Sequence, residues 1–537
     1  MNCRYPVVVA LMSVGVLGCA RSPEPAPTPD LADFDIAALQ QAMGDGTLSS
    51  RAITQWSLDR IAAVDDAGPT LNAVIATNPD ALVIADALDA ERKAGKVRGP
   101  LHGIPVLVKD NIDTGDRVPT TAGSLALAGA PAERDAEIVR RLREAGAVIL
   151  GKANLSEWAN IRSTRSSSGW SAVGGQTRNP HVLDRSPCGS SSGSGAAVAA
   201  GLVVAAIGTE TDGSIVCPAS ANGIVGFKPT VGLVSRQGIV PISHSQDTAG
   251  PMTRTVADAA ILLDAIAGTD PADPATAGVA GRTGGFQDAI QGASLAGRRF
   301  GIVRNHGGGA AAEPLLDSVI ATLRAQGAEV VDPVELPPPA EFSEGELVVL
   351  LTELKADLAE YLSRRGTQPV KSLADVIAFN EREAAVEMRW FGQELFLEAE
   401  RTDGLDSTGY RGNLARIRRL AGADGIDAAL AAHRVDALVA ITCSPAWSID
   451  LVMGDNAGVT CSSTPAAVAG YPSVSVPAGF VHGLPVGISF FSGAWRDPEL
   501  LGIAHAFDKA HAARRPPAYL PTVAFDAVPV TAQPGGY

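Results

Sequence analysis

A stretch rich in glycine and serine, residues 189–216, constrains the fold of this chain most strongly. It reads as a small-residue loop, an alanine-rich helix that could end at Gly201, an apolar segment at 202–207 and a tight loop ending at Ser214. Periodicity alone does not separate strand from buried helix at the apolar segment. Glycines in the first loop let the backbone approach a ligand closely. Ser190 and Ser214 therefore flank one compact unit, which suits a hydrolase with a serine nucleophile.

The composition permits a large core and excludes some partners. The chain has 537 residues, of which 46% are hydrophobic and 19% are charged. That length suffices for one large domain or for two to three ordinary ones. The formal net charge of −15 argues against binding to nucleic acid or to an anionic membrane surface.

The beginning of the chain resembles a bacterial export signal. Arg4 precedes an apolar run at residues 7–17, and a lipobox-like sequence ends at Cys19. We therefore expect a signal peptide at residues 1–19 and a proline-rich tether at residues 20–32. The expected location is the periplasm, or a membrane reached only through a lipid anchor at Cys19. Ordinary secretion without a lipid is the alternative.

The body of the chain, residues 33–515, alternates helical and strand-like patterns. This alternation predicts an α/β fold with a large mixed, mostly parallel β-sheet covered by helices on both faces. Residues 344–421 are mainly helical and are interpreted as an insertion on the substrate side, although their aromatic residues could simply pack helices together. Residues 516–537 are expected to form a C-terminal tail.

Four cysteines of the body have no assignable partner from sequence. They could form disulfides or remain buried thiols. None of the possible pairs has the spacing of zinc ligands, and the chain has no nucleotide-binding fingerprint. The four are Cys188, Cys217, Cys443 and Cys461.

Lys109 is the most conspicuous candidate for a base. It follows the apolar segment 104–108, which predicts a buried strand, and no histidine has an obvious place beside either serine. Burial disfavours the ammonium form and lowers the pKa of a lysine, and a neutral lysine is a competent general base. The plainer alternative is a lysine at a strand end that extends into solvent.

The second loop offers backbone amides to an oxyanion. Successive N–H groups in a tight turn after a buried strand could converge on the oxygen of a tetrahedral intermediate. A plain turn between strand and loop is the alternative. The residues of this turn are Thr211, Asp212, Gly213 and Ser214.

Three motifs in this order resemble those of the amidase signature family of serine hydrolases. GIPVLVKDNI contains Lys109, CGSSSGSGAAVA contains Ser190, and GTETDGSIVCPA contains Ser214. The resemblance covers about residues 33–515 and is densest in a core at residues 100–260. It implies the amidase signature fold.

The resemblance also implies a mechanism and a reaction. Ser214 would attack the amide carbonyl, and Ser190, following a cis peptide bond, would relay the proton to Lys109. Backbone amides of Thr211, Asp212 and Gly213 would form the oxyanion hole. The products would be a carboxylate and ammonia, with no cofactor and no metal required.

Two departures from the family pattern concern the substrate. Many relatives have an arginine where this chain has Val216, and Asp212 stands where a small or apolar residue is common. The sequence TDGSIVCP is similar to that of bacterial peptide amidases, which remove the C-terminal amide of peptides. The expected partner is therefore a small-molecule or peptide amide.

Three other interpretations remain open at this point. Residues 189–193 also fit the Gly-x-Ser-x-Gly elbow of an α/β-hydrolase esterase, with Ser191 as nucleophile and Asp497 and His505 as partners. The chain could be a catalytically inert exported binding lipoprotein. It could also be the amidase component of a tRNA-dependent amidotransferase, which the export signal argues against.

Overall fold

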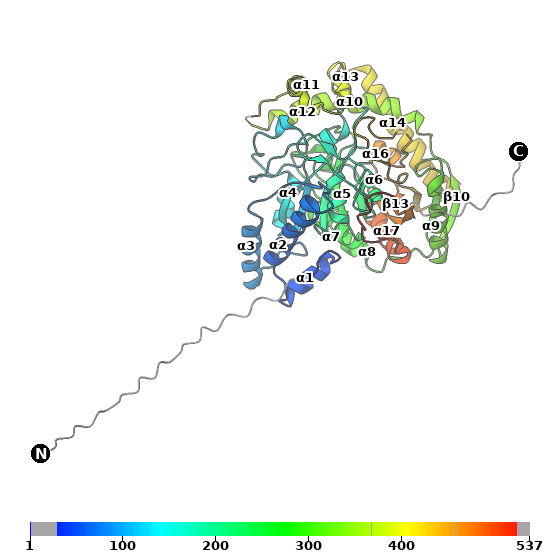
Figure 1. The fold of residues 1–537 in the computed structure, drawn as a ribbon. Helices are drawn as coiled ribbons and strands as arrows, with labels where there is room; N and C mark the ends of the chain where they lie inside the picture. The colour runs from blue at the N-terminus through cyan, green and yellow to red at the C-terminus, as the bar shows by residue number, and fades with distance from the viewer. Residues whose placement is uncertain (2–28, 367, 457, 524–537) are drawn as a thin grey trace.

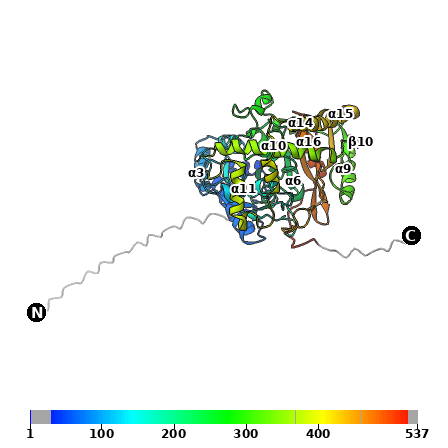
Figure 2. The same cartoon turned by 90° about the horizontal axis from the view of Figure 1, so that it is seen from above.

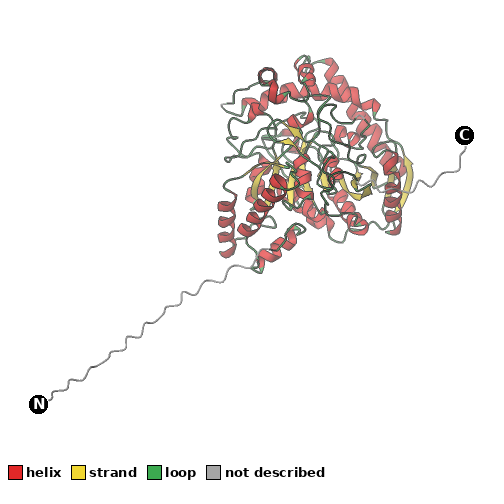
Figure 3. Cartoon of the chain, in the orientation of Figure 1, coloured by secondary structure: helices red, strands yellow, loops and turns green. Residues whose placement is uncertain are grey.

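The computed structural model describes residues 1, 29–366, 368–456 and 458–523. The lipobox-like sequence with Cys19, and most of the predicted signal peptide and tether, lie outside the described residues. So does most of the predicted C-terminal tail. Figures 1 and 3 show a central sheet with helices around it.

An 11-stranded mixed sheet forms the centre of the molecule. Its strands in spatial order are β1 (Val74–Thr77), β3 (Val148–Ala153), β2 (Pro105–Lys109), β6 (Ala205–Glu210), β8 (Thr248–Thr253), β7 (Val225–Lys228), β12 (Ser473–Val481), β13 (Leu484–Phe491), β11 (Ala437–Ile441), β9 (Arg299–Val303) and β10 (Glu329–Val334). A separate two-stranded sheet consists of β4 (Trp170–Ser171) and β5 (Gly175–Gln176).

Parallel pairing is confined to two blocks of the large sheet. These are β3-β2-β6 and β11-β9-β10, whereas the strands between them pair antiparallel. The predicted large mixed sheet is confirmed. Antiparallel pairs are more numerous than expected because β8, β7 and the hairpin β12–β13 separate the two parallel blocks.

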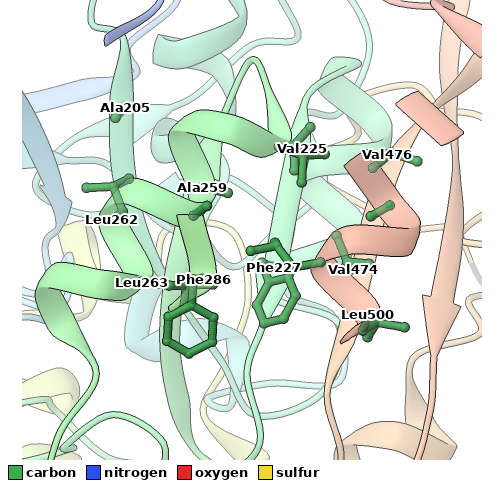
Figure 4. Close-up of a cluster of buried hydrophobic side chains, with 14 of the residues drawn as sticks. Ala205, Val225, Phe227, Ala259, Leu262, Leu263, Phe286, Val474, Val476 and Leu500 are labelled. Carbon is green, nitrogen blue, oxygen red and sulfur yellow. The ribbon is translucent and has the colours of Figure 1, made fainter. Parts of the chain in front are cut away.

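Helices cover both faces of the sheet, as predicted. The larger core packs strands such as β6, β7 and β12 against α7 (Val256–Ile266), α8 (Phe286–Ile290) and α17 (Asp497–His511). Figure 4 shows Phe227, Leu263 and Phe286 within this core. Helices on this face are α1 (Ile36–Gly44), α2 (Ser50–Arg60), α4 (Glu137–Glu144), α7 (Val256–Ile266), α8 (Phe286–Ile290), α9 (Glu313–Ala325) and α17 (Asp497–His511). Helices on the other face are α3 (Ala81–Lys93), α5 (Ser192–Ala199), α6 (Val216–Asn222), α15 (Asp427–His433) and α16 (Thr464–Ala469).

A further group of helices lies along the top of the view in Figure 1. One of them, α10 (Ala340–Ser363), crosses the molecule when it is seen from above in Figure 2. The group consists of α10 (Ala340–Ser363), α11 (Leu373–Arg382), α12 (Ala384–Glu387), α13 (Glu394–Glu400) and α14 (Thr408–Ala421). The segment predicted as a helical insertion, 344–421, occupies this group. Its contact with substrate stays a prediction. Among the described residues, no helix is both long and apolar enough to cross a membrane.

Small side chains allow the glycine-serine stretch, residues 189–216, to pack closely against its neighbours. Helix α5 is built only from serine, glycine, alanine and valine, and all its residues are buried. A Cβ on Gly193 would lie 2.2 Å from the carbonyl oxygen of Ala73, so only glycine permits this packing. Gly201, at φ +65°, follows the helix, and the chain then enters the fully buried strand β6. The loop before α5 and the loop after β6 meet where the Ser191 N–H donates to the Ser214 carbonyl at 3.1 Å.

Candidate active site

Lys109 ends strand β2 and is completely buried. Its Nζ lies 2.8 Å from Ser190 Oγ, 2.8 Å from Thr209 Oγ1 and 3.2 Å from the Thr209 carbonyl oxygen. Burial lowers the pKa of Lys109 to about 7, although the charges of Asp247 and Glu210 act in the opposite direction. A neutral amine would donate its two hydrogens to Thr209 and direct its lone pair at Ser190. The structure thus brings two of the predicted site residues, Lys109 and Ser190, into contact.

Contacts of its own backbone and of the preceding Gly189 fix the position of Ser190. It is 1% exposed, and the Gly189–Ser190 peptide bond is cis. The Ser156 N–H donates to the Ser190 carbonyl at 3.0 Å. A Cβ on Gly189 would lie 2.2 Å from Ser156 Oγ, so the position before Ser190 has room only for glycine. The Ser190 hydroxyl is therefore held against Lys109 by its backbone.

Ser214 lies at the end of the loop between β6 and α6 and is 9% exposed. Among the described residues, neither its hydroxyl nor the backbone N–H groups of residues 211–214 have a hydrogen-bond partner. Gly213 has φ +78°, a conformation that side chains disfavour, and a Cβ there would lie 3.0 Å from Ser463 Oγ. The turn thus presents several unpaired N–H donors next to a partly accessible hydroxyl.

Sequence reasoning did not identify the groups that hold these loops. Asn111 Nδ2 donates a hydrogen bond to Thr209 Oγ1 at 2.9 Å. Thr209 therefore contacts both Lys109, at the end of β2, and Asn111, two residues later. Glu210 Oε2 accepts the backbone N–H groups of residues 215 and 216, at the start of α6. Thr211 Oγ1 donates to Asp247 Oδ1 at 2.6 Å. Thr209 and Glu210 lie inside the motif GTETDGS, whereas Asp247 had no local signal.

Two disulfides lie beside the site and settle a pairing that the sequence left open. Cys188–Cys217 joins the segment before Ser190 to helix α6 after Ser214, and Cys443–Cys461 closes a neighbouring loop. Sulfur atoms of both bonds lie within 4.8 Å of one another. Because disulfide sulfurs are not thiolates, this cluster does not bind a metal as it stands.

One other group of side chains has the spacing of metal ligands within the described residues: His244, Glu353 and Asp357. The two oxygens of Glu353 already accept hydrogen bonds from the hydroxyls of Ser243, Ser245 and Tyr410. His244 donates to Asp357, which raises the pKa of the histidine. The group is explained as a hydrogen-bonded ion pair.

The elbow interpretation with Ser191 as nucleophile is wrong. Ser191 is 0% exposed, and its Oγ both donates to the Thr209 carbonyl and accepts the Thr209 N–H. Asp497 accepts two hydrogen bonds from Thr230 instead of orienting a histidine beside Ser191. Ser191 is a backbone clamp between the loop and β6.

A cavity of about 1030 Å³ adjoins the lysine side of the site. Its wall contains Asn111, Thr209 and Thr211 and continues along residues 236–242 to α10. Ser190 and Ser214 are not in this wall. The cavity therefore reaches Thr209, a hydrogen-bond partner of Lys109.

Comparison with known proteins gives a consistent family. The model of the family described as Amidase matches residues 52–501. The chain is 43% identical to a probable amidase of Arabidopsis thaliana over 520 residues, 95% of this chain and 96% of the relative. It is 38% identical to a glutamyl-tRNA(Gln) amidotransferase component of Symbiobacterium thermophilum over 487 residues, 88% of this chain and 96% of the relative. The native peptide amidase of Stenotrophomonas maltophilia is 53% identical, with a TM-score of 0.87, and 91% of this chain and 99% of that chain are covered.

The predicted location as an exported bacterial lipoprotein is wrong. Curated relatives of this chain include amidases of a plant and of two fungi, and none of their names refers to export or to a lipid anchor. The argument against an amidotransferase component depended on the export signal and therefore no longer applies.

The order of the three motifs, the contact of Lys109 with Ser190 and the match over residues 52–501 agree with one another. The chain belongs to the amidase signature family of amide-hydrolysing enzymes.

Proposed function

We propose that this amidase hydrolyses carboxamides, including the C-terminal amides of peptides, with Ser214 as nucleophile, Ser190 as proton relay and Lys109 as base. The observation that carries the proposal is the 2.8 Å contact between Lys109 Nζ and Ser190 Oγ in a fully buried setting. A serine hydroxyl needs a base within reach to become a nucleophile. A buried lysine with a pKa of about 7 is half neutral near physiological pH.

In the first step, Ser214 Oγ forms a bond to the carbonyl carbon of the amide. Its proton passes to Ser190 Oγ, while the proton of Ser190 passes to Lys109 Nζ. The carbonyl oxygen becomes negatively charged, and the unpaired N–H groups of residues 211–214 are the donors that would stabilise it. Loss of one such donor costs an enzyme about a hundred- to a thousand-fold in rate.

In the second step, the C–N bond breaks and the leaving nitrogen takes a proton back through the same relay. A primary amide thereby releases ammonia and leaves an ester on Ser214. Water then attacks the ester carbon and gives one proton to the relay. The bond between that carbon and Ser214 Oγ breaks, Ser214 takes the proton back from the relay, and the acid leaves as a carboxylate after losing its other proton to solvent. The relay ends in its starting state, so the cycle balances.

The likeness to a peptide amidase supports the narrower substrate class. That solved structure is 53% identical and 99% covered, and Val216 leaves this chain without the arginine that many family members have beside the nucleophile. A carboxylate-binding arginine would suit small anionic substrates, and its absence suits an uncharged peptide end.

The test is the release of ammonia by the purified chain alone from peptide amides, aryl amides and free amino-acid amides. The proposal expects turnover of peptide amides and its loss in Ser214→Ala. Turnover restricted to small aryl or aliphatic amides would refute the peptide class. Lack of both turnover and labelling by a fluorophosphonate would instead indicate an inert binding protein or a component that needs its partners.

A further inference from the structure

Two acidic side chains, one half-buried and one buried, lie beside the loop that contains Ser214. Asp212 belongs to this loop, and Glu346 comes from helix α10 and is 8% exposed. Gln246 links Glu346 to this loop, because its Nε2 donates to Glu346 Oε1 at 2.8 Å and to the Thr211 carbonyl at 3.3 Å. We call Asp212, Glu346 and Gln246 the acidic subsite.

Several polar atoms of the acidic subsite have no partner among the described residues. Asp212 Oδ1 and Gln246 Oε1 are buried without a hydrogen bond. Nδ1 of the neighbouring His306 also has no hydrogen-bond partner, and this residue is 3% exposed. Buried polar atoms without partners are costly, and each calls for a physical explanation. Here the unpaired atoms are mostly acceptors, which a ligand with several N–H donors would satisfy.

The charges around the acidic subsite are out of balance. Lys228 is the buried cation in reach of Asp212, but it is shared with Glu210 and Asp497. No cation within the described residues forms an ion pair with Glu346. Burial and the charge of Asp212 raise the pKa of Glu346 to about 8, so its carboxyl group is largely protonated at pH 7 and a cation bound beside it would favour the ionised form. Burial lowers the pKa of His306, so this side chain supplies no charge at neutral pH. The pair therefore lacks the counter-ion that would let both carboxyl groups ionise.

We propose that the acidic subsite binds a protonated primary amine of the substrate beside the scissile amide. The inference rests on the proposed function, since it names the kind of amide that the same nucleophile would prefer. An ammonium group has three donors and one positive charge, which match the unpaired acceptors and the uncompensated carboxyl pair. The amine could be a lysine-like side chain or a free α-amino group, and the chemistry of recognition is shared.

The experiment compares substrates that differ by one amine. N-acetyl-lysinamide is paired with N-acetyl-norleucinamide for the side chain, and norleucinamide is paired with N-acetyl-norleucinamide for the α-amino group. We expect the amine-bearing member of one pair to have kcat/KM about tenfold to a hundredfold higher at pH 7, as for a hydrogen-bonded charge. The substitution Glu346→Gln should bring that ratio to within about twofold, mainly through KM.

Glu344→Gln is the matched control. Glu344 lies on the same helix two residues away and is exposed, so its loss of charge should leave the ratio unchanged. If Glu346→Gln fails to fold, competitive inhibition of the native enzyme decides: n-butylammonium should inhibit at least tenfold more strongly than n-butanol. Equal kcat/KM within both pairs, or equal inhibition, would overturn the acidic subsite while leaving amide hydrolysis intact. Absence of ammonia release from every substrate would instead refute the proposed function.

Discussion

Two lysines on neighbouring strands, Lys109 of β2 and Lys152 of β3, are equally buried but have different partners. Lys152 donates to the Ile112 carbonyl at 2.7 Å and to Thr120 Oγ1 at 2.6 Å, and it lies 3.8 Å from Asp110 Oδ1. The partners of Lys109 are uncharged hydroxyl and carbonyl groups.

The difference is the one expected between a lysine that holds a structural charge and a lysine that acts as a base. Burial lowers the pKa of both amines, but carboxylates next to Lys152 favour its ammonium form. The acidic groups that act on Lys109, Asp247 and Glu210, are not within ion-pair distance of it among the described residues. Burial without an adjacent counter-ion, together with a serine hydroxyl at hydrogen-bond distance, is what suits Lys109 for proton transfer.

The largest expected effect is on catalysis by Lys109. Substitution Lys109→Met should lower kcat/KM by about 10⁴-fold or more, because the relay then has no proton acceptor. The same substitution at Lys152 should reduce the rate per folded molecule far less. Ammonia release, normalised to the folded fraction from circular dichroism, measures both. A Lys109→Met enzyme with more than about one-tenth of native activity would contradict the assignment.

For stability, we expect the larger effect from the substitution of Lys152 and the smaller effect from that of Lys109. Lys152→Met leaves the buried Asp110 carboxylate without its cation, and loss of one partner of a buried pair costs about 3–5 kcal/mol. Lys109→Met removes an amine whose charged form is already disfavoured, so this substitution should lower the free energy of unfolding much less. Urea denaturation of the two variants gives the free energies of unfolding. Equal losses would show that the two lysines do not differ as described.

A smaller effect comes from the threonines that accept from the two lysines. The ammonium form of Lys109 donates three hydrogen bonds and the neutral form donates two, so loss of an acceptor destabilises the ammonium form more. Thr209→Val should therefore lower the pKa of Lys109 and move the acid limb of kcat/KM to lower pH by about 0.5–1 unit. Thr120→Val, at Lys152, is the control and should leave the limb in place.

The sequence predicted much of the site because its parts lie in local motifs. A lysine after five mostly apolar residues and two serine loops around one helix-strand unit were visible without the fold. The roles of Ser214, Ser190 and Lys109 stay predictions until they are measured. The sheet was predicted in outline, but β1, β7 and β8 were not identified. In β8, Gly250 and Pro251 disrupt a strand pattern.

The remaining parts depend on contacts between distant segments. Asp247 reaches Thr211 across 36 positions, and Glu346 reaches Gln246 across 100. Neither acid has a motif of its own, so only the packing of the loop at 243–247 and of α10 against the site reveals it. Pairing of the four cysteines likewise required the fold.

The most direct test of the account is the titration of the Lys109 amine by heteronuclear NMR of lysine-labelled protein, with Lys109→Met used to assign the signal. We predict a midpoint at about pH 7, coincident with the acid limb of kcat/KM, which rises with pH because neutral Lys109 accepts the proton. An amine that stays protonated to its ordinary value of 10.5 while the enzyme is fully active at pH 7 would contradict the account.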